Sequence, residues 1–320
     1  MRKLIALIGA VTGLGLLLAA SFLGALHRPE PHDLPIAVVG PPQVAGQIAA
    51  ALASRAPGAF SLTPYADEQS ARDALAEREV DAVLMPQSGK LVVASAGGRT
   101  ASTAITQAFQ AAAQAQGRPL AVEDAFPLPP GDAGGISGIF YVVTLVLPGI
   151  AAAALISRVA PGLGLGGRLA VLTAAAVVIG TANAWLADVV FDALPGRFLA
   201  LAATSAGITL AVGLVTAGLL RLIGPAGVAL SALLIILIGL PASGGPLGAR
   251  FIPEWYAAVG HVLPFGSAAE AVTSVVHFGG AALASPLLVL GAWALLGLFA
   301  LAAPRRRAEH AVTDRSVLVA

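Results

Sequence analysis

Six long apolar runs dominate the pattern of hydrophobic and polar positions along the chain. We expect membrane-spanning helices at residues 4–26, 137–157, 169–187, 198–220, 226–240 and 286–303. A helix needs about 20 mostly apolar residues to cross a bilayer. None of the six runs contains Asp, Glu, Lys or Arg. Because one such charge at the bilayer centre costs about 2.5–3.5 kcal/mol on insertion scales, this absence supports a helical membrane fold with six spans.

Composition narrows the class of protein further. The chain is 57% hydrophobic and only 11% charged, whereas soluble domains carry about 25% charged residues. Most of the chain therefore cannot face water, which excludes a soluble enzyme and a disordered protein. The net charge of +1 creates no field that would attract nucleic acid. The chain has no cysteine, so disulfides and thiolate metal sites are also excluded.

The distribution of Lys and Arg predicts the orientation. If the N-terminus is cytoplasmic, nine of the 18 basic residues lie in inner segments and two, Arg197 and Arg250, lie in short outer connections. The other seven lie in residues 27–136, a segment long enough to be translocated regardless of its charge. We therefore expect a multi-pass protein of the plasma membrane with both termini cytoplasmic. Residues 304–320 form its basic cytoplasmic tail.

The first run has the basic start of a signal peptide. Its apolar stretch is longer than the usual 7–15 residues, and no clear A-x-A cleavage site follows it. Cleavage would also leave the following domain untethered at one end. We therefore favour a retained helix within residues 1–26 over a cleaved signal peptide.

Residues 27–136 change from apolar to mixed composition and hold 11 of the 17 acidic residues. Short apolar runs predict strands at 34–39, 60–65, 81–85 and 91–95, and a last strand from 120. Helices are expected at 43–55, 67–79, where Asp67 can cap the first turn, and 100–116. This order predicts an extracytoplasmic mixed α/β domain inserted between the first and second spans. Gly40-Pro41 and Gly97-Gly98 are either ligand-binding turns or plain turns, and we favour plain turns.

Few polar residues interrupt the five-helix membrane domain expected at residues 137–303. Pro148 lies within the second span and is either a hinge or the site of a static bend, which we favour. Asn183 either lines a pathway or bonds a neighbouring helix, and we favour the bond. Asp188 and Asp192 follow the third span, where we expect an interfacial ion pair with Arg197.

The outer connection at about 241–285 is too long for a simple loop and only partly apolar. Trp255 and Tyr256 are residue types that favour a membrane interface. The stretch that follows predicts one or two short helices that are re-entrant or lie in the outer leaflet. Glu270 and His277 are seven residues apart and therefore share one helix face.

Glu270 and His277, with His261, are competent metal ligands, but their spacing matches no compact zinc motif. We therefore expect no metal, and polar side chains that face water or a pore. The sequence has no G-x-x-x-x-G-K-[ST] motif and no catalytic set of residues. No carboxylate or histidine lies within a span, which argues against a proton-coupled antiporter. We expect neither enzymatic activity nor a bound cofactor.

The layout of one helix, a large outer α/β domain and five further helices resembles permeases of the ABC-2 type exporter superfamily. The closest resemblance is to phage-infection-protein-like and related actinobacterial membrane proteins. Three stretches carry it: LPIAVV at 34–39, EVDAVLMP at 79–86, and LPF at 263–265, which contains Pro264 and precedes an amphipathic helix. In the family, the last of these opens a re-entrant outer element.

The resemblance implies a homodimer or heterodimer of permeases that moves an apolar or amphiphilic molecule outward. It also implies a separate ATPase subunit, which would contact the inner loops at 158–168 and 221–225. A different hypothesis remains open. The chain would then be a non-transporting receptor or envelope scaffold whose outer domain binds a partner. A neighbouring ATPase gene would favour the permease.

Overall fold

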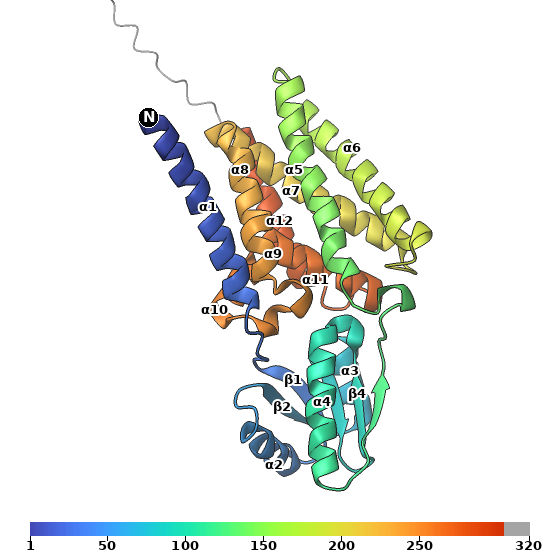
Figure 1. Ribbon diagram of the computed structural model, residues 1–320. Coiled ribbons are helices and arrows are strands. Elements are labelled where there is room, and N and C mark those ends of the chain that lie inside the picture. Colours follow the sequence, from blue (N-terminus) through green and yellow to red (C-terminus); the bar gives the residue numbers. More distant parts are fainter. Residues whose placement is uncertain (304–320) are drawn as a thin grey trace, which may run out of the picture.

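The computed structural model describes residues 1–303, and most of them are helical (Figure 1). Six helices are long and apolar enough to cross a membrane, or seven if the bent pair α10–α11 counts as one span. All six predicted spans are confirmed as helices. Their bounds are α1 Arg2–Leu26, α5 Ser137–Val159, α6 with its π-helical end at Leu165–Val190, α7 Phe198–Ile223, α8 to η5 at Ala226–Leu247, and α12 Ala284–Ala302.

Helix α7 is the centre of the bundle and packs against α5, α6, α8, α11 and α12. Glycines allow these close approaches. A Cβ added at Gly180 of α6 would lie 2.4 Å from the backbone nitrogen of Ala206 in α7. A Cβ at Gly218 would lie 2.6 Å from the carbonyl oxygen of Gly297 in α12. Small residues are therefore required where these helices cross, as is usual where lipid provides no hydrophobic drive for helix association.

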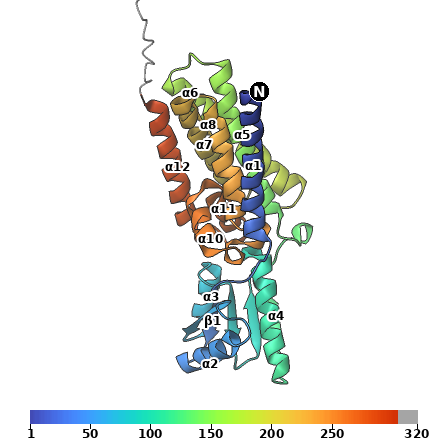
Figure 2. The same ribbon diagram turned by 60° about the vertical axis from the view of Figure 1, so that its left-hand side comes forward.

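The two ends of the bundle differ. The start of α1, the α5–α6 connection and the end of α12 lie at one end, which we call the basic end (Figures 1 and 2). The strands and the helices α10 Glu254–Val262 and α11 Pro264–His277 lie at the opposite end. Helix α1 is at one edge of the bundle, where it packs on α9 Gly239–Ala242 and the π-helical turn η4 Leu233–Ile238.

Five strands and three helices lie between α1 and α5, and we call residues 34–124 the sheet unit. The strand order is β2-β1-β3-β4-β5, with only the β3–β4 pair antiparallel. Each predicted strand begins within one residue of its expected position. The bounds are β1 Leu34–Val39, α2 Pro42–Ala53, β2 Phe60–Tyr65, α3 Glu68–Ala76, β3 Ala82–Met85, β4 Lys90–Val93, α4 Arg99–Ala115 and β5 Ala121–Asp124. The side chain of Asp67 caps α3 by accepting from the Ser70 N–H at 2.9 Å, as predicted.

Each face of the sheet has its own hydrophobic core. Helices α2 and α4 cover one face, where Leu52 and Ile105 pack against strand residues such as Ile36. Helix α3 covers the other face, where Leu75 packs against Val83. The two cores follow from the alternation of side chains along each strand.

The connection between α9 and α12 contributes one aromatic side chain to each core of the sheet unit. Phe251 is buried in the core beneath α2 and α4. Phe278 is buried in the core beneath α3 and stacks on Phe126, with ring centroids 4.8 Å apart. Burying a side chain of this size contributes roughly 1.5–3 kcal/mol. The sheet unit is therefore docked on the membrane helices by shared hydrophobic cores.

Arg78 strengthens this docking from an unusual backbone position. It follows α3 with a φ of 63°, the left-handed conformation that glycine normally supplies at a helix end. The Arg78 N–H donates to the Leu75 carbonyl at 3.1 Å and the Glu79 N–H to the Ala74 carbonyl at 2.8 Å, which closes the turn. The Arg78 side chain donates to Glu270 and to Ser274 of α11, each at 2.6 Å. Its guanidinium also lies 5.3 Å from the ring centre of Phe278.

Within the described residues, the predicted ion pair of Asp188 and Asp192 with Arg197 is absent. The Asp188 carboxylate instead accepts from the Gly196 N–H at 2.8 Å. A backbone donor in the same connection is closer than the arginine side chain and fixes the turn into α7. The prediction of an interfacial ion pair was therefore wrong.

Substitution of Arg78 tests the docking. We expect Arg78→Ala to lower the free energy of unfolding of the sheet unit by about 1–2 kcal/mol, because hydrogen bonds to a half-exposed carboxylate are lost. Arg78→Gly should be less harmful by about 1 kcal/mol, since glycine adopts the left-handed conformation without strain. Hydrogen exchange of β3 and α11 in the full chain measures both effects. Arg55→Ala, which removes an exposed charge far from α11, is the control. Equal loss with Arg55→Ala would contradict this account.

Glu123 of β5 makes the stability of the sheet unit depend on pH in a predictable way. Hydrogen bonds from Arg72 of α3 and from Lys90 of β4 lower the pKa of Glu123 to about 2. An unfolded glutamate has a pKa of about 4.3. The stabilisation is therefore fully present above about pH 4.3 and is lost as the pH falls towards about 2.

We expect Glu123→Gln to lower the melting temperature of the full chain above pH 4.3, and the difference from the unmodified chain to close near pH 2. Circular dichroism melts at several pH values measure this difference. Glu79→Gln, which removes an exposed carboxylate that forms no ion pair among residues 1–303, is the matched control. A difference that does not change with pH would refute the role of the Arg72–Glu123–Lys90 cluster.

Candidate functional site

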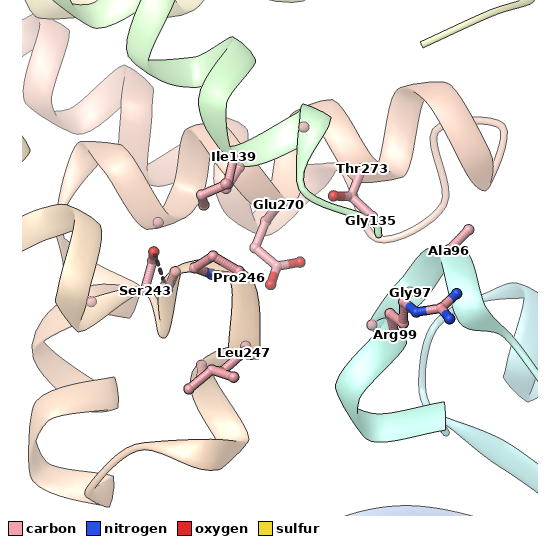
Figure 3. A pocket seen from close by; sticks show the side chains of 18 of the residues that line it. Ala96, Gly97, Arg99, Gly135, Ile139, Ser243, Pro246, Leu247, Glu270 and Thr273 are labelled. Carbon is pink, nitrogen blue, oxygen red and sulfur yellow. Dashed lines mark hydrogen bonds between the residues drawn. The ribbon is translucent and has the colours of Figure 1, made fainter. Parts of the chain in front are cut away.

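A cavity of about 570 Å³ lies where the sheet unit meets the membrane helices. We call it the junction cavity (Figure 3). The sheet unit contributes Arg78 and residues 95–99, and the connection between α9 and α12 contributes residues from Ser243 to Ala249. Helices α5, α10 and α11, the connection between β5 and α5, and the start of α12 provide the rest of the lining. The cavity exists only because the two parts of the chain are docked.

Helix α11 forms one wall with its polar face. Glu270, Thr273 and His277 line the cavity, and the Glu270 side chain points into it (Figure 3). The prediction that Glu270 and His277 share a helix face is confirmed. On its other face α11 buries Phe265 and Val272 in the core of the bundle. The same helix is therefore both a wall of the cavity and a part of the bundle core.

The opposite wall comes from the sheet unit. Gly97, Gly98 and Arg99 line it at the start of α4 (Figure 3). Gly97 is packed closely against the connection between α9 and α12, because a Cβ there would lie 3.3 Å from the ring of Phe278. Gly97 and Gly98 therefore line the cavity between the short helix η1 Ser95–Gly97 and α4, and the preference for a plain turn stays a prediction.

The charges around the junction cavity are only partly neutralised. Glu270 is paired with Arg78 at 2.6 Å. Asp132 is buried and accepts from the N–H groups of Ile136 and Ser137, each at 3.1 Å, which stabilises the start of α5. Arg99 is exposed, and its side chain forms no ion pair or hydrogen bond within residues 1–303.

Apolar side chains, among them those of Ile139 and Leu247, also line the cavity. A lining that combines these side chains with the charged ones suits a ligand with an apolar body and a polar or anionic group. No three His, Asp or Glu side chains come together as a metal site in the part of the chain that the structure describes. His261, Glu270 and His277 all line the cavity but form no such group.

The break between α10 and α11 gives the junction cavity its shape. The two helices meet at an angle of 79°. Pro264 is the first residue of α11, and Leu263 before it is extended, as proline imposes on its predecessor. Side chains hold α10 from two directions. Tyr256 and Ser21 of α1 share a hydrogen bond of 2.5 Å, and the indole N–H of Trp293 in α12 donates to the Val262 carbonyl at 2.7 Å.

The two predicted candidates inside spans do not line the cavity. Pro148 lies within α5, which continues on both sides of it. The side-chain amide of Asn183 donates to the Ile179 carbonyl of its own helix at 2.9 Å. The predicted bond from Asn183 to a neighbouring helix was therefore wrong, because its own helix already offers an acceptor one turn away.

A second cavity, also of about 570 Å³, lies at the carboxyl ends of β1 and β3. Gly40, Pro41 and Arg118 are among its lining residues. Ligands of α/β sheets commonly bind at this edge of the strands. The Gly40-Pro41 turn therefore lines a cavity of the sheet unit.

Sequence reasoning missed several residues of the junction. Arg78, Arg99, Phe251 and Phe278 were all passed over. Arg78 carried no sequence signal, because it fell within the helix expected at 67–79, whereas α3 ends at Ala76 and Arg78 takes the left-handed conformation after it. The partners of the others lie far away in the sequence.

Comparison with known proteins gives no match: no family model, no curated protein and no solved structure is significantly similar to this chain.

Proposed function

We propose that the chain is the membrane permease subunit of an ABC-2 type exporter, which moves an apolar or amphiphilic molecule outward. In this proposal the sheet unit is an extracytoplasmic domain, both termini are cytoplasmic, and the protein lies in the plasma membrane. The asymmetry of Lys and Arg supports this orientation.

The single observation that carries the proposal is the position of α11. One face of α11 belongs to the bundle core and the other lines the junction cavity. A rearrangement of α5 or α7, which both contact α11, would therefore change the shape of the cavity. This coupling is what a permease needs to release a molecule at its outer side.

The source of energy must come from another subunit. The sequence has no phosphate-binding P-loop motif. A separate ATPase would contact the α5–α6 and α7–α8 connections at the basic end, and two permease chains would form the complete transporter. The apolar walls favour a substrate with an apolar body, and Arg99, which forms no ion pair within residues 1–303, favours a polar or anionic group on it.

A receptor or envelope scaffold is the second candidate function. The cavity at the carboxyl ends of β1 and β3 favours it, because a partner could bind there without reaching the membrane helices. This hypothesis needs no ATPase.

Affinity purification of the tagged full chain from membranes in mild detergent, followed by mass spectrometry, separates the two functions. The permease proposal predicts a P-loop ATPase in stoichiometric amount. Recovery of the chain alone, or with envelope proteins only, would instead support the receptor.

Two matched variants test whether the ATPase contacts the α5–α6 connection. A Cβ at Gly162, in the α5–α6 connection, or at Gly46, in α2, meets nothing within 4 Å. We expect Gly162→Trp to reduce recovery of the ATPase to background, because the large side chain obstructs the basic end. Gly46→Trp should leave recovery unchanged. Equal recovery with both variants would exclude the α5–α6 connection as the contact.

A further inference from the structure

A cavity of about 720 Å³ at the basic end is lined by three arginines. It lies among the ends of α5, α6, α7 and α8. Arg158, Arg168 and Arg221 are part of its lining, and no Asp or Glu is. We call it the basic cavity.

Nothing in the described chain neutralises this charge. Within residues 1–303, every Asp and Glu lies between positions 30 and 132 or at position 188, 192, 254 or 270. These positions belong to the sheet unit and its flanks, or to the end of the bundle beside it (Figure 1). The start of α1 adds Arg2 and Lys3 to the basic end. The electrostatic potential there is therefore positive over a low-dielectric surface.

Two of the arginines are held in place by backbone carbonyls. Arg168 donates from Nε to the Leu163 carbonyl at 2.9 Å and from Nη2 to the Pro161 carbonyl at 2.8 Å. Arg221 donates from Nε and Nη2 to the Ala303 carbonyl at 3.2 and 3.0 Å. These bonds orient each guanidinium and leave further N–H groups free to donate. Arginine forks of this kind match the oxygens of a phosphate group.

Arg158 is the exposed member of the set. Its side chain forms no ion pair with any residue of the described chain. Large apolar side chains beside the cavity are exposed as well, namely those of Leu155, Val159, Leu222 and Ile223. A ligand that fits both features has an anionic group in the cavity and an apolar chain along the lipid-facing helices.

We propose that the basic cavity binds the phosphate headgroup of an anionic membrane lipid. Basic pockets between membrane helices bind such headgroups at the leaflet where basic residues accumulate. The acyl chains would lie along the exposed apolar residues of α5 and α7. This site does not depend on the proposed transport activity, because a receptor with the same bundle would hold the same lipid.

Native mass spectrometry of the purified full chain, with equimolar dioleoyl phosphatidylglycerol and dioleoyl phosphatidylcholine in the micelle, tests the site. We expect retention of phosphatidylglycerol in preference to phosphatidylcholine. Arg158→Gln should weaken that retention about fivefold and Arg158→Glu about 30-fold, since each charge near an anionic headgroup has an effect of this size. Arg158 is chosen because its exposed side chain holds no other element in place.

Arg2→Gln is the matched control, because it removes one charge from the same end of the bundle but outside the cavity. It should change retention by less than about twofold. Equal weakening by Arg2→Gln, or equal retention of the two lipids, would overturn the proposal in favour of general surface attraction. Displacement of the lipid by millimolar inorganic phosphate would also overturn it, because the site would then be one for a soluble anion.

Discussion

The insertion of Phe251 and Phe278 into the two cores of the sheet unit is the interaction on which the rest of the structure depends. Each aromatic comes from the connection between α9 and α12 and fills the core on a different face of the sheet. Arg78 adds hydrogen bonds to Glu270 and Ser274 at the same contact. Arg250 adds another, from its guanidinium to the Asp33 carbonyl at 2.7 Å. The sheet unit is therefore not an appendage on two linkers but shares its hydrophobic interior with the bundle.

The junction cavity is a consequence of this docking. Its walls belong to elements that would separate if the aromatics withdrew: Arg99 on the sheet unit and Glu270 on α11. The shape of the cavity is consequently set by the position of α11 in the bundle, whose core holds Phe265 and Val272. The two parts are joined by packed side chains as well as by the chain connections between them. Both the permease and the receptor would use this property.

Local sequence patterns predicted most of the secondary structure but few of the residues at the junction cavity. Long runs without charge identify the spans because bilayer thickness sets their length. Short apolar runs between turn residues identify strands such as β1, which agrees with the expected 34–39. Glu270 and His277 were found from helix periodicity alone. Arg78 and Glu270, by contrast, are 192 residues apart, and no local pattern reports such a pair. The partners of Asn183 and Asp188 were predicted wrongly for the opposite reason: each side chain forms a hydrogen bond with a backbone group close to it in sequence.

The central claim is that the sheet unit and the membrane helices form one docked body. The chain contains no cysteine, so two spin labels can be placed without removing any residue of that type. Electron–electron double resonance between labels at Gln47→Cys in α2 and Leu288→Cys in α12 measures the relative position of the two parts directly. The docked structure predicts one narrow distance distribution, which broadens when Arg78→Ala and Phe278→Ala are combined. A broad distribution in the otherwise unmodified chain, or no change in that double variant, would contradict the claim.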